Sequence, residues 1–326
     1  MQRSSGHNDD LGIKKRGETQ TEGHTGRAHR CRNASFPERD VHMALFRPFR
    51  FPGIYVVGKL RAFTRILSCC QVELWLFIHK NPDGLLAVYS RRMGTEVRKR
   101  REIAVGDIHG RADALEAILD KLAPGPEDTL VFLGDYIDRG PDSAEVFERL
   151  MALDRERAER DVFLMGNHEE MLFRWAGLLE DDGYREAWLA VGGHEVLRQW
   201  GGKAPGHVMD WLERRLLVRH RTDRAYYVHG GFRAGPDFYT ATTDRECLWL
   251  RGEFVRSSYR YPLPVCVGHT TVDRIPGGRL GGGPILDYDR NVMYLDCACF
   301  ATGVLAAYDV IGDEVTVVRV SRRLYI

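Results

Sequence analysis

Metal-ligand side chains occur in three short strings, and each string follows a run of hydrophobic residues. The strings are GDIHG at 106–110, GDYIDRG at 134–140 and GNHE at 166–169. Carboxylate, imidazole and amide groups together form a ligand set that suits Mn, Fe, Zn or Co. The candidate ligands in these strings are Asp107, His109, Asp135 and Asn167. We therefore expect three strand ends to converge on a metal site.

Two further histidines occur in the same setting later in the chain. His229 follows the apolar run 225–228, and His269 follows the run 265–268. A histidine at a strand end can also simply hydrogen-bond a backbone carbonyl, which is the alternative for both residues. With the first four ligands they could hold two divalent ions about 3.5 to 4 Å apart, and Asp135 is the candidate carboxylate that bridges them.

Such a pair of ions indicates hydrolysis of a phosphate ester, because the ions bind phosphoryl oxygens, activate a water and stabilise the leaving oxygen. His168 directly follows a ligand, so it is placed to protonate the leaving alkoxide, and Asp138 would favour its charged form. The planar guanidinium of Arg139 suits phosphate oxygens. Turn chemistry is the competing explanation, but three strings in order followed by two histidine turns rarely coincide.

Residues 103–320 resemble the phosphoprotein phosphatase branch of the calcineurin-like metallophosphoesterases, especially the compact serine/threonine protein phosphatases of bacteria and phages. The resemblance rests on the three strings, the two histidine turns and the sequence LWLR at 248–251. It implies one metal ion on Asp107, His109 and Asp135, and a second on Asp135, Asn167, His229 and His269. It also implies that His168 is the general acid, that Asp138 is its partner, and that Arg139 and Arg251 bind phosphate. An ordinary surface cation is the alternative for Arg251, which lies in a charged stretch.

The elements that must position these residues alternate between strands and helices from Arg101 onward. The patterns predict strands over 102–105, 129–133 and 162–165, and helices over 111–122, 143–153 and 169–179. This order puts the ligands at the carboxyl ends of strands, where open α/β sheets place their sites. A helical stretch over 184–217 and strands near 225–229, 264–268, 292–296, 303–309 and 314–320 should follow. The resemblance implies an α/β fold, a four-layer α/β/β/α sandwich with two mixed sheets.

The first hundred residues differ in kind from the rest. Residues 1–40 are polar and poor in aliphatic side chains, so we expect them to be disordered. Hydrophobic residues return over 46–89, but the runs are too short and polar for a spanning helix. A peripheral membrane helix within 57–80 is an alternative, and synthesis could begin at Met43 or Met93. We expect a weakly structured extension at 1–100, without a secretory signal, and a catalytic domain at 101–326.

The overall composition suits an enzyme of a reducing compartment. The formal net charge is +1, which gives no global attraction to nucleic acid or to a membrane surface. The seven cysteines contain no Cys-x-x-Cys pair and no regular framework, which favours a cytoplasmic location. We expect no nucleic-acid partner and no integral membrane association, and the sequence leaves the oligomeric state open.

These observations predict a metal-dependent phosphoesterase that acts by direct attack of a hydroxide bound to two metal ions, with Mn preferred over Fe, Zn or Co. A serine/threonine protein phosphatase is favoured because Glu169 after His168, and Asp138 before Arg139, resemble that class. The substrate would be a phosphoprotein or a small phosphorylated compound. The alternative is a symmetrical bis(5'-nucleosyl)-tetraphosphatase or another nucleotide pyrophosphate hydrolase. A metal-stabilised binding module is disfavoured, because every catalytic position is filled.

Overall fold

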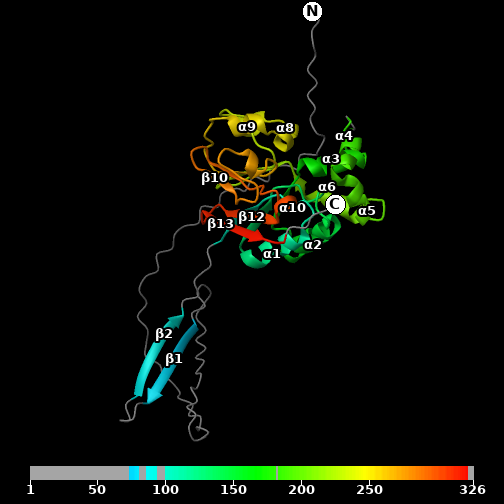
Figure 1. Cartoon of the computed structure of the whole chain (residues 1–326). Coiled ribbons are helices and arrows are strands. Elements are labelled where there is room, and N and C mark those ends of the chain that lie inside the picture. The colour runs from blue at the N-terminus through cyan, green and yellow to red at the C-terminus, as the bar shows by residue number, and fades with distance from the viewer. Residues whose placement is uncertain (1–72, 81–85, 94–99, 181–182, 322–326) are drawn as a thin grey trace, which may run out of the picture. The chain divides into compact units, whose positions relative to one another are not determined.

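The computed structural model describes residues 73–80, 86–93, 100–180 and 183–321 (Figure 1). Strands β1 (Glu73–Lys80) and β2 (Leu86–Met93) pair antiparallel, and they belong to a different compact unit from residues 100–321. The helix considered for residues 57–80 is therefore wrong over 73–80, which form a strand. Residues 1–72, which include the whole segment expected to be disordered, lie outside the described part of the chain.

The larger unit is built on two mixed sheets. The six-stranded sheet has the order β13-β12-β3-β4-β5-β6, and the five-stranded sheet has the order β10-β11-β9-β8-β7. In the first sheet β3 (Glu102–Val105), β4 (Thr129–Phe132), β5 (Val162–Leu164) and β6 (Leu216–Leu217) are parallel neighbours. Its other edge is antiparallel and consists of β12 (Val304–Asp309) and β13 (Glu314–Arg319).

The second sheet has a parallel centre and antiparallel edges. Strands β8 (Tyr226–Val228), β9 (Val265–Val267) and β11 (Val292–Tyr294) form the parallel centre. The edges are β7 (Arg219–Arg221) and β10 (Ile285–Asp287). Neither edge strand was predicted, because both are three residues long and lack a strong apolar pattern.

Alternate residues of the strands face opposite layers, as the pleat requires. In β3, Ile103 and Val105 pack with the residues of the flanking helices, whereas Ala104 packs in a separate cluster with the second sheet. In β8, Tyr227 belongs to that same inner cluster, and its neighbours Tyr226 and Val228 belong to a third cluster on the outer side. The predicted four-layer α/β/β/α sandwich is therefore confirmed.

The helices cover the two outer faces. Figure 1 shows α1 (Ala112–Leu122) and α2 (Ser143–Glu156) on one side of the strands, and α8 (Asp244–Trp249) and α9 (Gly252–Arg256) on the other. The shorter helical segments are α7 (Phe238–Ala241), the 3-10 turn η2 (Val272–Arg274) and α10 (Cys299–Thr302). Within the described ranges, no helix combines the length and apolar character needed to cross a membrane.

Two helical predictions need correction. The helix expected at 169–179 is α3 (Asn167–Trp175), so Asn167 and His168 lie in its first turn rather than before it. The single stretch expected over 184–217 is broken into α4 (Tyr184–Trp188), a π turn η1 (Leu189–Gly193), α5 (His194–Gln199) and α6 (Gly206–Arg215). Within the π turn, Gly192 has a φ of 134°, which is incompatible with a regular helix.

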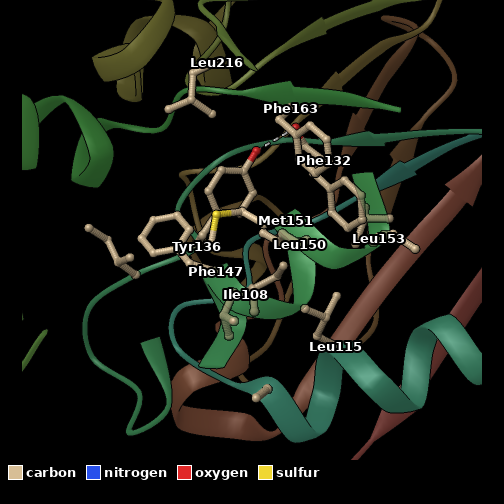
Figure 2. Close-up of a cluster of buried hydrophobic side chains, with 14 of the residues drawn as sticks. Ile108, Leu115, Phe132, Tyr136, Phe147, Leu150, Met151, Leu153, Phe163 and Leu216 are labelled. Atoms are coloured by element: carbon tan, nitrogen blue, oxygen red, sulfur yellow. Dashed lines mark hydrogen bonds between the residues drawn. The ribbon is translucent and has the colours of Figure 1, made fainter. Parts of the chain in front are cut away.

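The core beneath the first sheet is continuous with the turn that carries Asp135. Figure 2 shows the next residue, Tyr136, packed among Phe147 and Met151 of α2, with Phe132 and Phe163 close by. Tyr136 is fully buried, and its hydroxyl donates a hydrogen bond to the carbonyl of Leu164 at 2.7 Å. The turn after β4 is thus anchored in the core on one side while Asp135 faces the site on the other.

Candidate metal and phosphate site

The predicted ligands come from the carboxyl ends of adjacent strands in both sheets. Three neighbouring parallel strands of the first sheet, β3, β4 and β5, are followed by Asp107 and His109, by Asp135 and by Asn167. Two neighbouring parallel strands of the second sheet, β8 and β9, are followed by His229 and His269. Because all of these strand ends lie at one edge of the sandwich, residues up to 162 positions apart come into contact.

The loops at these strand ends have unusual backbone conformations. Five of the ten predicted site residues have a left-handed φ: His109 (46°), Asp135 (51°), Asp138 (68°), Arg139 (65°) and His269 (62°). Left-handed backbone is costly for residues other than glycine and persists where the surrounding structure enforces it. Here the first two loops hold each other, because the N–H of His109 donates to the carbonyl of Asp135 at 2.9 Å.

Five of the predicted residues form two groups of potential metal ligands that share Asp135. One group is His109, Asp135 and His168, the other is Asp135, His229 and His269, and the ligand atoms in each lie within 4.8 Å of one another. The two carboxylate oxygens of Asp135 face different groups. Oδ2 lies 3.4 Å from Nε2 of His109, and Oδ1 lies 3.3 Å from Nε2 of His229. This is the geometry that a bridging carboxylate requires.

Asn167 and Asp107 adjoin these groups. Oδ1 of Asn167 lies 3.1 Å from Nε2 of His229. Oδ2 of Asp107 accepts a hydrogen bond from the backbone N–H of His269 at 2.9 Å. Asp107 is in neither three-residue group, whereas His168, expected beside the ions rather than on them, is in the first.

Two of the histidines are held in the tautomer that suits a metal ligand. Nδ1 of His109 lies 2.7 Å from the carbonyl of Ile137, and Nδ1 of His229 lies 2.9 Å from the carbonyl of Leu133. A carbonyl only accepts, so Nδ1 carries the proton and Nε2 carries the lone pair of the neutral ring. Burial also lowers the pKa of His109 and His269 well below the usual range, which keeps both rings neutral.

Burial and neighbouring charges shift the pKa values of the two carboxyl groups in opposite directions. Burial, followed by the charges of Asp296 and Asp135, raises the pKa of Asp107 well above its usual range. Burial acts in the same direction on Asp135, but the surrounding histidines outweigh it and hold the pKa of that carboxyl well below its usual range. Oδ1 of Asp107 and Nε2 of His269 are buried without a hydrogen-bond partner among the described residues. Two carboxylates, three imidazoles and an amide, with unsatisfied ligand atoms, fit a pair of divalent cations.

His168 and Asp138 form a buried pair at the border of the first group. Nδ1 of His168 lies 2.5 Å from Oδ2 of Asp138, and both side chains are almost fully buried. The guanidinium of Arg139 spans the two histidines, with one nitrogen 2.7 Å from Nε2 of His109 and the other 2.8 Å from Nε2 of His168. Arg251 donates to the carbonyl of His269 at 2.7 Å, so its guanidinium lies next to one of the predicted ligands.

Three side chains of the site were not predicted from the sequence. Asp296 is buried, and burial raises its pKa to about 6. Phe300 packs against the ring of His109 at 5.5 Å and beneath the guanidinium of Arg139 at 5.0 Å. Trp188 donates a hydrogen bond to Asp138. The sequence contained a signal only for Asp296, which directly follows an apolar strand as Asp107 and Asp135 do.

Comparisons with known proteins agree with this geometry. A family model described as calcineurin-like phosphoesterase matches residues 101–282. The symmetrical bis(5'-nucleosyl)-tetraphosphatase of Hamiltonella defensa is 28% identical over 204 residues, which is 62% of this chain and 68% of that protein. The catalytic subunit of serine/threonine-protein phosphatase 6 of Drosophila melanogaster is 41% identical over 64 residues, 20% of this chain and 21% of that protein.

Among solved structures, a serine/threonine phosphatase from Saccharomyces cerevisiae is 14% identical, covers 71% of this chain and 84% of its own, and superimposes with a TM-score of 0.44. The chain spans only about a fifth of the length of the protein-phosphatase relative from Drosophila.

Proposed function

The chain belongs to the calcineurin-like phosphoesterase family, and from this we propose that it is a metal-dependent phosphatase that hydrolyses phosphoserine and phosphothreonine in proteins. The observation that carries the proposal is the arrangement around Asp135. Its two oxygens face two ligand groups, and the pair formed by His168 and Asp138 lies at the border of one of them. A bridged pair of ions beside a buried acid suits cleavage of a phosphomonoester with a poor leaving group.

The residues that would hold the two ions are Asp107, His109, Asp135, Asn167, His229 and His269. Two divalent ions, when bound, supply Lewis acidity that polarises the phosphoryl group and lowers the pKa of a water molecule. We propose manganese for both positions, with iron, zinc or cobalt as alternatives, because imidazole, carboxylate and amide ligands suit these metals. Burial and neighbouring carboxylates raise the pKa of Asp107 and of Asp296, and bound cations would favour their charged forms, which supports a requirement for cations at this site.

The protein's own groups would bind the phosphoryl group and provide the proton. Arg139 and Arg251 lie on either side of the ligand groups and can each donate two hydrogen bonds to phosphoryl oxygens. The attacking water loses one proton to solvent, and its oxygen becomes a phosphate oxygen as the bond from phosphorus to the serine oxygen breaks. The serine oxygen takes its proton from Nε2 of His168, while Asp138 holds the Nδ1 proton and stabilises the charged ring.

A second candidate function is symmetrical cleavage of a dinucleoside tetraphosphate. The observation that favours it is the match to the Hamiltonella defensa enzyme, which covers more of both chains than the protein-phosphatase match does. The same metals and arginines would serve, but ADP is a better leaving group than a serine alkoxide. A buried histidine acid is therefore needed less for that reaction than for phosphoserine hydrolysis.

We also propose a cytoplasmic location. The support is that the four cysteines in the described ranges are all free and buried, and none of them forms a disulfide. Disulfides are rare in reducing compartments and frequent in secreted proteins.

The experiment that tests the function compares two substrates on the full chain after metal stripping and Mn addition. We expect a higher kcat/KM for a phosphoserine peptide than for diadenosine tetraphosphate. His168→Asn should lower peptide turnover by about 10²-fold or more, whereas the matched surface variant His207→Asn should not, because His207 is exposed. Faster symmetrical cleavage to ADP would favour the second function. Absence of Mn-dependent turnover of both substrates would overturn both proposals.

A further inference from the structure

A short helical cap lies directly over the proposed acid pair. The cap consists of α4, the π turn η1 and α5, and its residue Trp188 is fully buried. The indole Nε1–H of Trp188 donates a hydrogen bond to Oδ2 of Asp138 at 2.9 Å. The same oxygen lies 2.5 Å from Nδ1 of His168. Asp138 therefore links an indole on the cap to the imidazole at the site.

We propose that Trp188 is a positioning residue for phosphate-ester hydrolysis. Its N–H holds the carboxylate of Asp138 so that Oδ2 faces Nδ1 of His168, and this directs Nε2 of the ring toward the leaving oxygen. The inference rests on the proposed function, in which His168 is the general acid. It adds a third member, contributed by the cap, to the pair formed by His168 and Asp138.

The hydrogen bonding of Asp138 explains why this contact matters. Its other oxygen, Oδ1, is buried and has no hydrogen-bond partner among the described residues. The orientation of the carboxylate thus depends on the two donors at Oδ2, the His168 ring and the Trp188 indole. Without the indole N–H, the imidazole would be the remaining side-chain donor, and the pair could turn together. Small rotations of an acid relative to its leaving group are costly in rate.

Two neighbours pack against the indole of Trp188. A Cβ at Gly193 would lie 2.4 Å from Cδ2 of Trp188, so the glycine lets the backbone of the π turn rest directly on the ring. The indole of Trp175 also packs near the indole of Trp188, and the centroids of the two rings are 5.4 Å apart. A Cβ at Gly192 would come within 3.0 Å of the Cβ of Asp138. The two glycines thus bring the cap within contact of Asp138 and its tryptophan partner.

A tryptophan that served only as a core residue would need the ring but not the N–H at this position. Trp188→Phe tests the difference, because it keeps an aromatic ring and removes the donor. Trp175→Phe is the matched control, since it changes an indole in contact with Trp188 that makes no hydrogen bond to Asp138. Each variant of the full chain would be assayed with Mn on a phosphoserine peptide and on p-nitrophenyl phosphate.

We expect Trp188→Phe to lower kcat for the peptide by about tenfold with little change in KM, since the contact serves only the acid. The kcat for p-nitrophenyl phosphate should stay within about twofold, because nitrophenolate leaves without a proton. In the Asp138→Asn background the same substitution should have an effect of less than about twofold, because the two residues act through one contact. Trp175→Phe should leave the ratio between the two substrates unchanged.

Equal losses on both substrates would overturn the proposal and leave Trp188 as a packing residue. If Trp188→Phe fails to fold, the contact can be tested by NMR of the indole protons, where Asp138→Ala should shift the Trp188 signal and an unchanged signal would refute the contact. Failure of the proposed function would look different, because His168→Asn itself would then affect the peptide and p-nitrophenyl phosphate equally.

Discussion

Asp107, Asp135 and Asp296 bring three buried carboxylates together at the edge of the sandwich. Burial is the largest cause that raises the pKa of Asp296 to about 6; the N–H of Ala298 opposes the rise, and the charge of Asp135 adds to it. One oxygen of Asp296 accepts that N–H at 2.8 Å, and the other is buried without a partner in the described ranges. Such a carboxylate weakens the fold unless nearby cations balance its charge.

The first prediction concerns Asp296→Asn, which removes the charge and keeps an oxygen for the Ala298 N–H. The unfolded carboxyl has a pKa of about 3.9 and the folded one about 6, so the folded state binds more protons between these values. The contribution of Asp296 to wild-type stability therefore falls as pH rises through this window. In metal-stripped protein the variant should be more stable by about 3 kcal/mol well above pH 6 and equally stable near pH 4.

Urea unfolding of stripped protein at several pH values measures this difference. With Mn present the sign should reverse, because loss of a neighbouring negative charge weakens the binding of cations. The exposed Asp223 provides the matched control, and Asp223→Asn should change neither quantity. A variant that is less stable than the wild type at pH 8 without metal would contradict the prediction.

At the scale of elements, the start of α3 is joined to the turn after β4 by Glu169. One oxygen of Glu169 accepts the N–H of Tyr136 at 2.8 Å, and the other accepts those of Asp135 and Gly166 at 2.9 Å each. The helix that carries His168 is thereby held against the loop that carries Asp135. This explains why α3 begins at Asn167, two residues earlier than its apolar pattern predicted.

The second prediction follows from this link. Glu169→Gln places an amide NH₂ against at least one backbone N–H, so at least one buried donor loses its acceptor. We expect a loss of about 3 kcal/mol in the free energy of unfolding, together with weaker Mn binding because the Asp135 loop shifts. Denaturant unfolding at pH 8, above the pKa of about 7 to which burial raises Glu169, is the measurement.

Glu213→Gln is the control for this substitution, because Glu213 is exposed on α6 and should tolerate the change. If Glu169→Gln were as stable as the wild type and bound Mn with the same affinity, the link between α3 and the β4 turn would have no energetic importance.

At the scale of the whole molecule, each sheet contributes part of the site. The first sheet provides the ends of β3, β4 and β5, the second provides the ends of β8 and β9, and the inner cluster holds the two sheets together. A cation that binds residues of both sheets therefore binds only the folded sandwich and stabilises it. All three hydrophobic clusters, like every candidate site residue, lie between residues 103 and 320.

The third prediction concerns the proposed boundary between an extension at residues 1–100 and a catalytic domain at residues 101–326. A chain that begins at Met93 should keep kcat within about twofold of the full chain, because the groups that determine transition-state stabilisation are retained. Metal stripping should lower Tm by about 10 °C in both forms, as expected for loss of a tightly bound ligand. Activity assays and thermal unfolding of the two forms check this. Loss of activity with an unchanged Tm would show that residues before Met93 contribute to the site.

The sequence alone was sufficient for features that depend on neighbouring residues. Apolar runs followed by Asp107, Asp135, His229 and His269 identified strand ends, because strand periodicity and turn chemistry are local properties. The order of these runs predicted alternating strands and helices with candidate ligands at strand ends, and the family resemblance implied the four-layer sandwich and the assignment of the ligands to two metal ions. The short edge strands and the break at Gly192 were missed, because their conformations are imposed by packing rather than by a pattern.

Tertiary structure alone decided which side chains meet. Trp188 lies 50 residues from Asp138, and the backbone of His269 lies 162 residues from the carboxylate that accepts its hydrogen bond. No local pattern encodes such contacts, since they depend on strand order, on the approach of the two sheets and on the glycines that admit the cap. Asp296 is a further example. Like the predicted ligands it comes after an apolar strand, but only the pairing of β11 with β9 in the folded chain places it near Asp107.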